Sequence, residues 1–414
     1  MLDIGAVRRR TLRSLAVPNY RRYFAGSAVS VIGTWMQRVA QDWLVLDLSH
    51  SAVALGIASA LQFIPVLFAG PWGGAVVDRH SRRRLLIVTQ SSAAVLAAVL
   101  AALTLSHSVA LWMVYVLAFG LGVVTVFDTP GRQAFLTELV AGPDLVNAQA
   151  LYSTAHNAGR LIGPALAGVT ISAVGVGWAF AINAFSFLAV LRSLTGIDPA
   201  SLRPAQMVQK ARGQVTAGIR YVWDDVDLRR CAIAVLLVGV FAQNFRVVLP
   251  LIARRTLHGD ASTYGWLTAA LGLGAVVGAL TSAAREHVRR RTLGAAYAAL
   301  GVFELGVASS PGLGVALAAL MAVGVANLTA NTLSRTLMLT GAAEGLQGRV
   351  MAIYSLVFLG SSPIGGPAIG WLCGRFGARA GMVAGGIGAL AACAVLVSPR
   401  RHAWQRDAAI ANRR

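Results

Sequence analysis

The sequence of 414 residues has little charge and few acids. Asp, Glu, Lys and Arg together make up 13% of the chain, about half of the roughly 25% that is usual in soluble domains. Hydrophobic residues make up 56%, and the mean hydropathy is +0.66. This composition excludes a soluble enzyme and a disordered chain.

Cysteine is also scarce. The three cysteines lie far apart, in or near apolar stretches, at Cys231, Cys373 and Cys393. No pair has the spacing of a metal site or a redox motif. A disulfide scaffold is therefore excluded, and we expect the thiols to act as small hydrophobic side chains.

Motifs of enzymes and of processed proteins are missing as well. The sequence has no paired His–Glu metal motif, no phosphate-binding loop and no nucleophile elbow. It therefore predicts no enzyme activity, no cofactor and no metal, with an ion gradient rather than ATP as the energy source. No signal-peptide pattern follows the Arg-rich N-terminus, so we expect the first membrane helix to direct insertion.

Long apolar stretches are abundant. A helix needs about 20 apolar residues to cross a bilayer. Twelve stretches reach that length, near 22–46, 51–76, 85–106, 109–130, 148–173, 176–194, 231–253, 262–284, 292–310, 312–334, 350–373 and 379–397. The sequence predicts an all-helical integral membrane protein with twelve spans.

The basic residues predict the orientation. With both termini in the cytoplasm, 29 of the 36 Lys and Arg fall on the cytoplasmic side and 4 fall outside, as expected for a cell-membrane protein. Basic proteins often bind nucleic acid. Here the charge is divided among separate segments, so anionic membrane lipid is the expected partner and nucleic acid is not.

The two parts of the chain resemble each other. The sequence Gly163-Pro164-Ala recurs 203 residues later as Gly366-Pro367-Ala. Repeats of this kind predict two bundles related by a pseudo-two-fold axis, with a site between them. The predicted order is a cytoplasmic tail (1–21), a six-helix bundle (22–194), a cytoplasmic linker (195–230), a second six-helix bundle (231–398) and a basic cytoplasmic tail (399–414).

The loop between the second and third spans carries a motif, Gly74-Ala-Val-Val-Asp78-Arg79-His80-Ser81-Arg82-Arg83. It resembles the signature loop of the major facilitator superfamily, except that Ser81 replaces the usual glycine. The resemblance implies a latch that closes the cytoplasmic side in the outward-open state, formed by Gly74, Asp78, Arg79, Arg82 and Arg83. In the second half Arg285 stands where the Asp would align, which argues against an equivalent second latch.

The fifth span carries a second motif. Its residues Gly159, Gly163, Pro164 and Gly168 resemble the antiporter motif of the same superfamily, with Ala167 in place of one glycine. Pro164 should kink the helix, and the small residues should pack against span eight. The resemblance implies export and a sealed inner path, whereas generic small-residue packing is the alternative.

A third stretch, 127–135, together with Asn147 and the segment 183–187, resembles the superfamily branch of enterobactin exporters, macrolide-efflux proteins and multidrug carriers. The resemblance implies a monomeric, proton-coupled exporter of small amphipathic molecules that works by alternating access. One alternative is a dedicated siderophore or metabolite transporter. Another is a membrane sensor or scaffold without flux.

Two acids inside spans are candidates for proton coupling. Asp42 lies four residues after Arg38, so the two can pair on one face of span one, beside Gln37 and Gln41, which would line a cavity. Either Asp42 takes up a proton and releases Arg38, or the pair is a fixed structural one. Glu304 is the second candidate, and we expect it to be protonated or paired.

The other polar residues of the spans have two interpretations each. We expect Asp128 to pair with Arg132 or with an arginine of the signature loop. Arg160 and Arg246 can each attract an anionic cargo or answer a buried acid, and pairing is favoured for Arg160. The amides can bind cargo or join helices, and they are Asn183, Asn244, Asn327 and Asn331.

Overall fold

The computed structural model describes residues 12–203, 214–283, 289–343 and 345–398. Within these ranges the chain forms helices and no strand, as expected from the sequence. The predicted C-terminal tail (399–414), Arg285, and parts of the predicted N-terminal tail and central linker lie outside the described residues.

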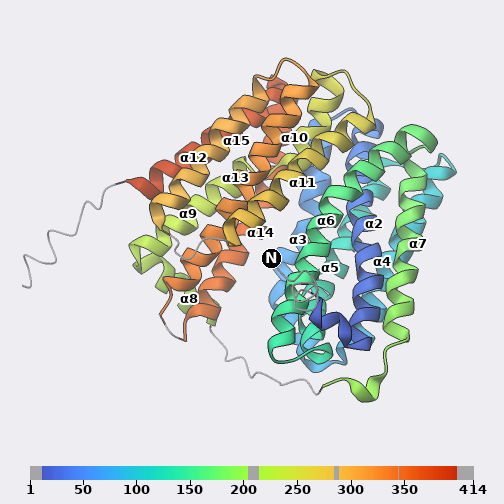
Figure 1. Cartoon of the computed structure of the whole chain (residues 1–414). Helices are drawn as coiled ribbons and strands as arrows, with labels where there is room; N and C mark the ends of the chain where they lie inside the picture. The colour runs from blue at the N-terminus through green and yellow to red at the C-terminus, as the bar shows by residue number, and fades with distance from the viewer. Residues whose placement is uncertain (1–11, 204–213, 284–288, 344, 399–414) are drawn as a thin grey trace, which may run out of the picture.

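The helices form two groups (Figure 1). The first group consists of α2 (Pro18–Ser49), α3 (Ala52–Arg79), α4 (Arg82–Leu105), α5 (Leu111–Leu139), α6 (Pro143–Val174) and α7 (Val176–Thr195). The second group consists of α8 (Gln214–Asp224), α9 (Val226–Phe241), α10 (Phe245–Leu251) with a π-helical turn (Ile252–Thr256), α11 (Ala261–Ala283), α12 (Arg290–Ala308), α13 (Leu313–Thr340), α14 (Gln347–Phe376) and α15 (Ala378–Val397).

The outer surface of the helices suits a bilayer. Among the described residues, nine helical stretches are long and apolar enough to cross a membrane. Large hydrophobic side chains such as Phe68, Trp72 and Trp371 are more than half exposed on this surface. The chain is therefore a multi-pass membrane protein.

Three long helices are too polar to count among those nine, namely α2, α6 and α12. They carry charged residues that the sequence placed inside spans: Arg38 and Asp42 in α2, Arg160 in α6, and Glu304 in α12. Charge inside a membrane helix is costly and usually marks function, so these helices direct attention to the interior.

The two groups cross at two equivalent places. Helix α6 of the first group packs on α11, and α14 of the second group packs on α3. A Cβ atom added to Gly56 of α3 would lie 2.3 Å from the carbonyl oxygen of Gly366 in α14. A Cβ atom added to Gly168 of α6 would lie 2.9 Å from the Cα atom of Ser262 in α11. Only glycine allows backbones to approach this closely. Gly366 belongs to the second Gly-Pro-Ala sequence, and Gly168 follows the first one.

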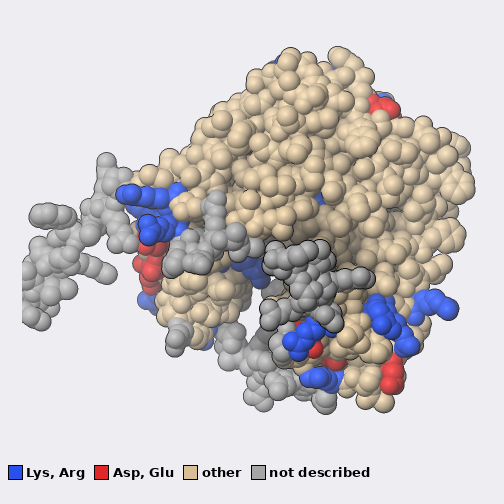
Figure 2. Space-filling view, in the orientation of Figure 1, with Lys and Arg blue, Asp and Glu red and all other residues tan. Residues whose placement is uncertain are grey.

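The bundle has two different ends. At the arginine-rich end, where α2, α4 and α12 begin, Lys and Arg gather along the lower edges of the molecule (Figure 2). At the opposite end, called the distal end here, α2 ends at Ser49 and α11 begins at Ala261. The two groups of helices meet in the upper part of the view and diverge toward the arginine-rich end (Figure 1).

The segment between the groups contains a helix that was not predicted. Helix α8 lies inside the expected linker 195–230. Its Val222 is fully buried, and the hydroxyl oxygen of Tyr221 accepts a hydrogen bond from the backbone N–H of Ala343 at 3.1 Å. A short helix with one buried face is too polar on average for a search based on apolar runs to find it.

The predicted span 231–253 is also interrupted. Helix α9 ends at Phe241 and α10 begins at Phe245. The side-chain amide of Asn244 donates to the carbonyl oxygen of Val240 at 2.6 Å, so a side chain competes with the backbone for this acceptor. No glycine or proline lies between the two helices, at residues 242–244, so the break has no signal in the sequence. The predicted span itself is retained, because Val226–Thr256 as a whole is long and apolar enough to cross a membrane.

Candidate functional site

The first group of helices encloses a cavity of about 400 Å³, which is within the size range of small-molecule sites. All six of its helices contribute to the wall. The polar residues that line it include Thr34, Gln37, Arg38, Gln41, Gln62, Gln90, Asp128, Arg132, Tyr152, His156 and Asn183. Sequence reasoning missed Gln62, Gln90, Tyr152 and His156, although polar side chains inside apolar spans are the signal that would have pointed to them.

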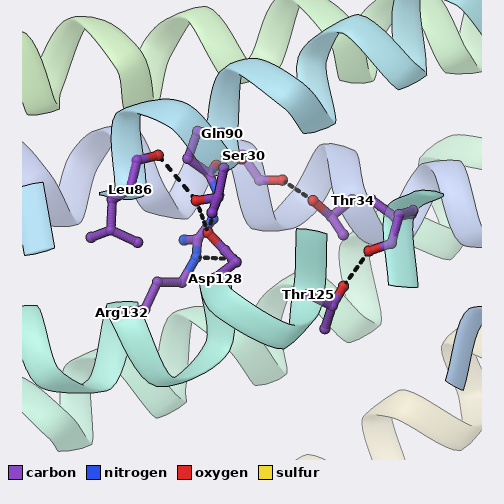
Figure 3. Close-up of polar contacts among 9 residues, drawn as sticks. Ser30, Thr34, Leu86, Gln90, Thr125, Asp128 and Arg132 are labelled. Atoms are coloured by element: carbon purple, nitrogen blue, oxygen red, sulfur yellow. Dashed lines mark hydrogen bonds and ion pairs between the residues drawn. The ribbon is translucent and has the colours of Figure 1, made fainter. Parts of the chain in front are cut away.

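Asp128 is the acid on this wall. Its carboxylate accepts from Arg132 Nε at 2.7 Å, from Gln90 Nε2 at 2.6 Å and from the Thr89 hydroxyl at 2.9 Å. Figure 3 shows Asp128 and Arg132 on α5 pointing together toward Gln90 on α4. The predicted pairing of Asp128 with Arg132 is confirmed. Several charge-assisted hydrogen bonds on one carboxylate make a stable cluster.

Asp42 has a different partner from the one predicted. Its two oxygens accept from Arg246 of α10, Oδ1 from Nη2 at 2.7 Å and Oδ2 from Nε at 3.0 Å. The hydroxyl of Tyr264 in α11 also donates to Oδ2 at 3.0 Å. Asp42 therefore links the two groups of helices, and the expected pair with Arg38 is not formed. The flat guanidinium of Arg246 meets the carboxylate in a two-pronged geometry that favours it.

Arg246 has a second acceptor in the first group. Its Nη1 donates to Gln62 Oε1 of α3 at 2.7 Å. Asp42 is 4% exposed, so this network lies in the interior. The sequence left two roles open for Arg246, attraction of an anionic cargo and pairing with a buried acid. In the structure Arg246 pairs with the buried acid Asp42.

Arg38 and Arg160 both lie close to one aromatic ring. The guanidinium carbon of Arg38 is 4.5 Å from the ring centre of Trp35, and that of Arg160 is 5.7 Å from it. The ring of His156 meets the same indole edge-on, at 5.6 Å between centres. The favoured pairing of Arg160 with an acid is wrong, because this guanidinium contacts Trp35 instead.

Further contacts close the distal end between the groups. Arg254 donates to Asp47 at 3.0 Å, and Arg255 donates to the backbone carbonyl of His50. The hydroxyl of Ser172 in α6 donates to Asp260 at 3.1 Å. Together with the Asp42–Arg246 pair, these bonds hold the two groups together at and beneath the distal end.

The arginines of the signature loop lie at the other end and bond within the first group. Arg82 pairs with Glu138 of α5 at 3.2 Å. Arg83 donates to the carbonyl oxygens of Leu194 and Thr195, at 2.7 and 2.8 Å. These bonds tie α4 to the ends of α5 and α7.

The other residues predicted for the latch, Gly74, Asp78 and Arg79, lie near the end of α3. Asp78 is half-buried, and Arg79 is exposed. Gly73, next to Gly74, makes a close approach to α5, because a Cβ atom on Gly73 would lie 2.3 Å from the carbonyl oxygen of Val126.

The glycines of the fifth-span motif face two directions. Gly168 packs on α11, as expected. A Cβ atom on Gly163 would lie 2.6 Å from the Cβ of Trp35, and one on Gly159 would lie 2.6 Å from Val31. These two glycines therefore pack on α2 of their own group, which corrects the prediction, and Gly163 helps to position Trp35. Pro164 lies inside α6, and its carbonyl faces α11.

Glu304 is sealed inside the second group. It is 1% exposed, and neither carboxyl oxygen has a hydrogen-bond partner. A Cβ atom on Gly385 of α15 would lie 2.1 Å from its Oε2 and 3.2 Å from the Cα of Ala242, at the α9–α10 break. The carboxyl group is thus enclosed by α12, α15 and the end of α9.

The amides join helices. Asn183 of α7 donates to Gln37 of α2. In the second group Gln243 donates to Asn327 at 2.8 Å and to Asn331 at 3.1 Å. No three His, Cys, Asp or Glu side chains in the described ranges gather closely enough to hold a metal ion.

A family model described as transmembrane secretion effector matches residues 10–414. The chain belongs to this family. The predicted place in the exporter branch of the major facilitator superfamily is confirmed, and the family's relatives are transporters rather than enzymes.

Relatives of this chain are named for different cargoes. The multidrug efflux pump Tap of Mycolicibacterium fortuitum is 29% identical over 80% of this chain and 84% of its own length. The enterobactin exporter EntS of Citrobacter koseri is 26% identical, over 86% and 85%. The staphyloferrin A transporter of Staphylococcus aureus is 27% identical over 62% of this chain, which spans 65% of that relative.

Solved transporter structures share the fold. The nucleoside transporter NupG superposes with a TM-score of 0.72 at 11% identity, over 92% of this chain and 100% of the NupG chain. A bacterial homologue of the human lysosomal transporter Spinster gives 0.71 at 14% identity, over 93% and 96%. At such low identity the likeness shows the fold alone.

Proposed function

We propose that this protein exports small amphipathic molecules by alternating access, driven by proton entry. In this proposal all twelve long helices span the cell membrane, and the arginine-rich end faces the cytoplasm, in line with the distribution of basic residues. The observation that carries the proposal is the Asp42–Arg246 pair, which joins the two groups of helices beside the cavity.

The arrangement corresponds to one state of a transport cycle. The groups are bonded at the distal end, for example through Arg254 and Asp47, and they diverge toward the arginine-rich end (Figure 1). The cavity would then load from the cytoplasm. Rocking of one group against the other would break the distal bonds and open the cavity outward.

Asp42 is our first candidate for proton coupling. When the distal end opens, Asp42 loses Arg246 and Tyr264, and outside protons can then neutralise a carboxylate that no longer has a partner. On return, the guanidinium pairs with the carboxylate again and displaces the proton toward the inside. Each cycle would carry one proton inward. Glu304 remains the second candidate, although it lies away from the bonds that must break.

A second candidate function is the dedicated export of a siderophore or other metabolite. Two similar proteins are named for siderophores, enterobactin and staphyloferrin A. Two arginines without acidic partners near the cavity, Arg38 and Arg160, also favour acidic cargo over cationic cargo.

The test is transport by purified protein in liposomes with an imposed pH gradient. We expect accumulation of fluorescent dyes or siderophores in inside-out vesicles only when protons can flow the other way. Asp42→Asn should abolish the gradient dependence, whereas Asp47→Asn, which removes an exposed acid of the distal end, should retain it. No movement of any compound under any gradient would exclude transport. Intact proton coupling in Asp42→Asn would move the role to Glu304.

A further inference from the structure

The charges around the cavity do not balance. Asp128, the acid on the wall, is already bound by Arg132 and by two side chains of α4. Asp42 lies near the wall, but Arg246 holds both of its oxygens. Each of these acids therefore neutralises an arginine other than the two beside Trp35.

Two arginines are left over. Arg38 lines the cavity, and Arg160 is not a lining residue but lies beside Trp35, which is one. No ion pair or hydrogen bond of their guanidinium groups occurs in the described part of the chain, and both contact the ring of Trp35 instead. Arg246 and Arg160 act on Arg38 as like charges. Asp42 attracts Arg38, although Arg246 already holds both oxygens of that carboxylate. Two cations held near one ring inside a membrane protein are costly unless an anion joins them.

The wall offers donors where such an anion would bind. The amide Nε2 of Gln41 is buried and has no hydrogen-bond partner, although this side chain lines the cavity and is 3% exposed. A buried donor without a partner is rare, and an acceptor group of a ligand in the cavity would satisfy it. His156 lies edge-on to Trp35 on the same wall.

Apolar side chains complete the cavity. Val31, Leu121 and Phe187 line it beside the indole of Trp35. A few directional polar groups on a largely apolar wall are what a site for a small amphipathic molecule needs.

We propose that the cavity binds an anionic amphiphile, a small molecule with carboxylate groups that lie between Arg38 and Arg160 and an apolar part that packs on Trp35. This inference rests on the proposed transport function for its purpose, but not for its chemistry. A cationic molecule of the same shape would meet two like charges and no acid without a partner.

The experiment compares three probes that share one apolar body: naphthoate, naphthalenemethanol and naphthyl trimethylammonium. Binding of each radiolabelled probe to the purified full-length protein is measured by equilibrium dialysis. We expect naphthoate to bind at least about tenfold more tightly than the other two, since charge-assisted hydrogen bonds are the stronger ones. Equal binding of all three, tighter binding of the ammonium, or no binding of naphthoate would overturn the proposal.

Variants locate the site. Arg38→Gln and Arg160→Gln should each weaken naphthoate binding by about tenfold and leave naphthalenemethanol unchanged. Arg38→Lys should retain part of the affinity, because it keeps the charge. The matched control is Arg192→Gln, which removes an exposed arginine at the end of α7 and should change nothing. Unchanged naphthoate binding in both glutamine variants would contradict the site.

Binding and flux separate the two proposals. Selective naphthoate binding without movement across liposomes would leave the anion site standing and remove the transport function. Flux of cationic dyes with no preference for naphthoate in binding would support the transport function and overturn the anion site. If a glutamine variant fails to fold, the comparison of the three probes on the unaltered protein still tests whether the cavity prefers anions.

Discussion

The two groups of helices pack in the same way, but the buried acid of the first group has hydrogen-bond partners and that of the second has none. In the first group Asp42 accepts hydrogen bonds from Arg246 and Tyr264, and its charge is matched. In the second group Glu304 is equally buried and its oxygens have no partner. Burying an ion requires a partner, whereas an uncharged carboxyl can stay alone at a smaller cost. A repeated fold therefore fixes where helices lie, and not which side chains carry charge.

Packing between the groups is symmetric by contrast. Gly56 meets Gly366 where α3 crosses α14, and Gly168 meets Ser262 where α6 crosses α11. Both crossings depend on close contact between backbones at a glycine. The four predictions below, in order of decreasing effect, test the contrast between asymmetric charge and symmetric packing.

The largest effect should follow loss of the carboxylate that both groups share. Asp42→Asn leaves Arg246 as a buried cation without a matching charge, so we expect the folded state to lose about 3–5 kcal/mol. Chemical denaturation in detergent measures the change. The double variant Asp42→Asn/Arg246→Gln should recover most of it, because no lone charge remains.

The exposed pair of the distal end is the control for this variant. Asp47→Asn removes the partner of Arg254 and should cost about 1 kcal/mol or less, since Asp47 is largely exposed. Equal losses in Asp42→Asn and Asp47→Asn would mean that the buried pair contributes no more than a surface one.

The two glycine crossings should respond equally. Gly56→Ala and Gly168→Ala each insert a methyl group where backbone atoms already touch, so the state closed at the distal end should lose about 1–3 kcal/mol. Spin labels at Ser106 and Ser309, exposed on opposite groups at the distal end, report the separation in a background without native cysteines. We expect longer label distances in both variants.

Gly374→Ala is the matched control in α14, because a Cβ atom there has no neighbour within 4 Å. Its label distance should match that of the unaltered protein. A shift at only one of the two crossings would show that the packing is not symmetric.

Glu304 should tolerate loss of its charge. Because a lone buried carboxyl is expected to be uncharged, Glu304→Gln should change stability by about 1 kcal/mol or less. Glu304→Met removes an unsatisfied polar group and should stabilise the fold slightly. Thermal unfolding followed by intrinsic fluorescence measures both. A loss as large as that of Asp42→Asn would reveal that Glu304 has a charged partner in another state.

The smallest effect concerns pH at the start of α11. The hydroxyl of Ser262, the backbone N–H of Thr263 and the hydroxyl of Ser172 all donate to Asp260, and they lower the pKa of its carboxyl from 3.8 to about 2. A lowered pKa in the folded state means stability that is present above about pH 4 and is lost as the pH falls through about 2.

Asp260→Asn should therefore be slightly less stable than the unaltered protein at pH 6, and the difference should shrink as the pH approaches 2. Thermal unfolding of both proteins across this range gives the comparison. A difference that stays constant with pH would show that the ionised carboxylate is not the group that matters.

Local patterns in the sequence predicted the parts of the site that depend on one helix. Asp128 and Arg132 are four residues apart in α5, so their pairing follows from helix geometry. The apolar runs predicted the long helices, and the motifs predicted the family. The α9–α10 break at Asn244 was missed, because a side chain that bonds to its own backbone leaves no glycine or proline as a signal.

The sequence could not predict which side chains from different helices would become partners. Arg38 was the nearest candidate for Asp42 along the chain, but Arg246, 204 residues away, reaches both oxygens of the carboxylate. Arg160 was expected to pair and instead contacts Trp35.

Composition and spacing by themselves determined that this chain is an all-helical membrane protein with repeated halves and charges inside its spans. Hydropathy and helix periodicity act within one segment, so they can be read without the fold. Only the tertiary structure decided which charges are matched, which amides face the cavity and which end is closed. Those outcomes depend on distances between helices, and an ion pair or a buried donor is satisfied only by the group that packing brings within a few ångströms.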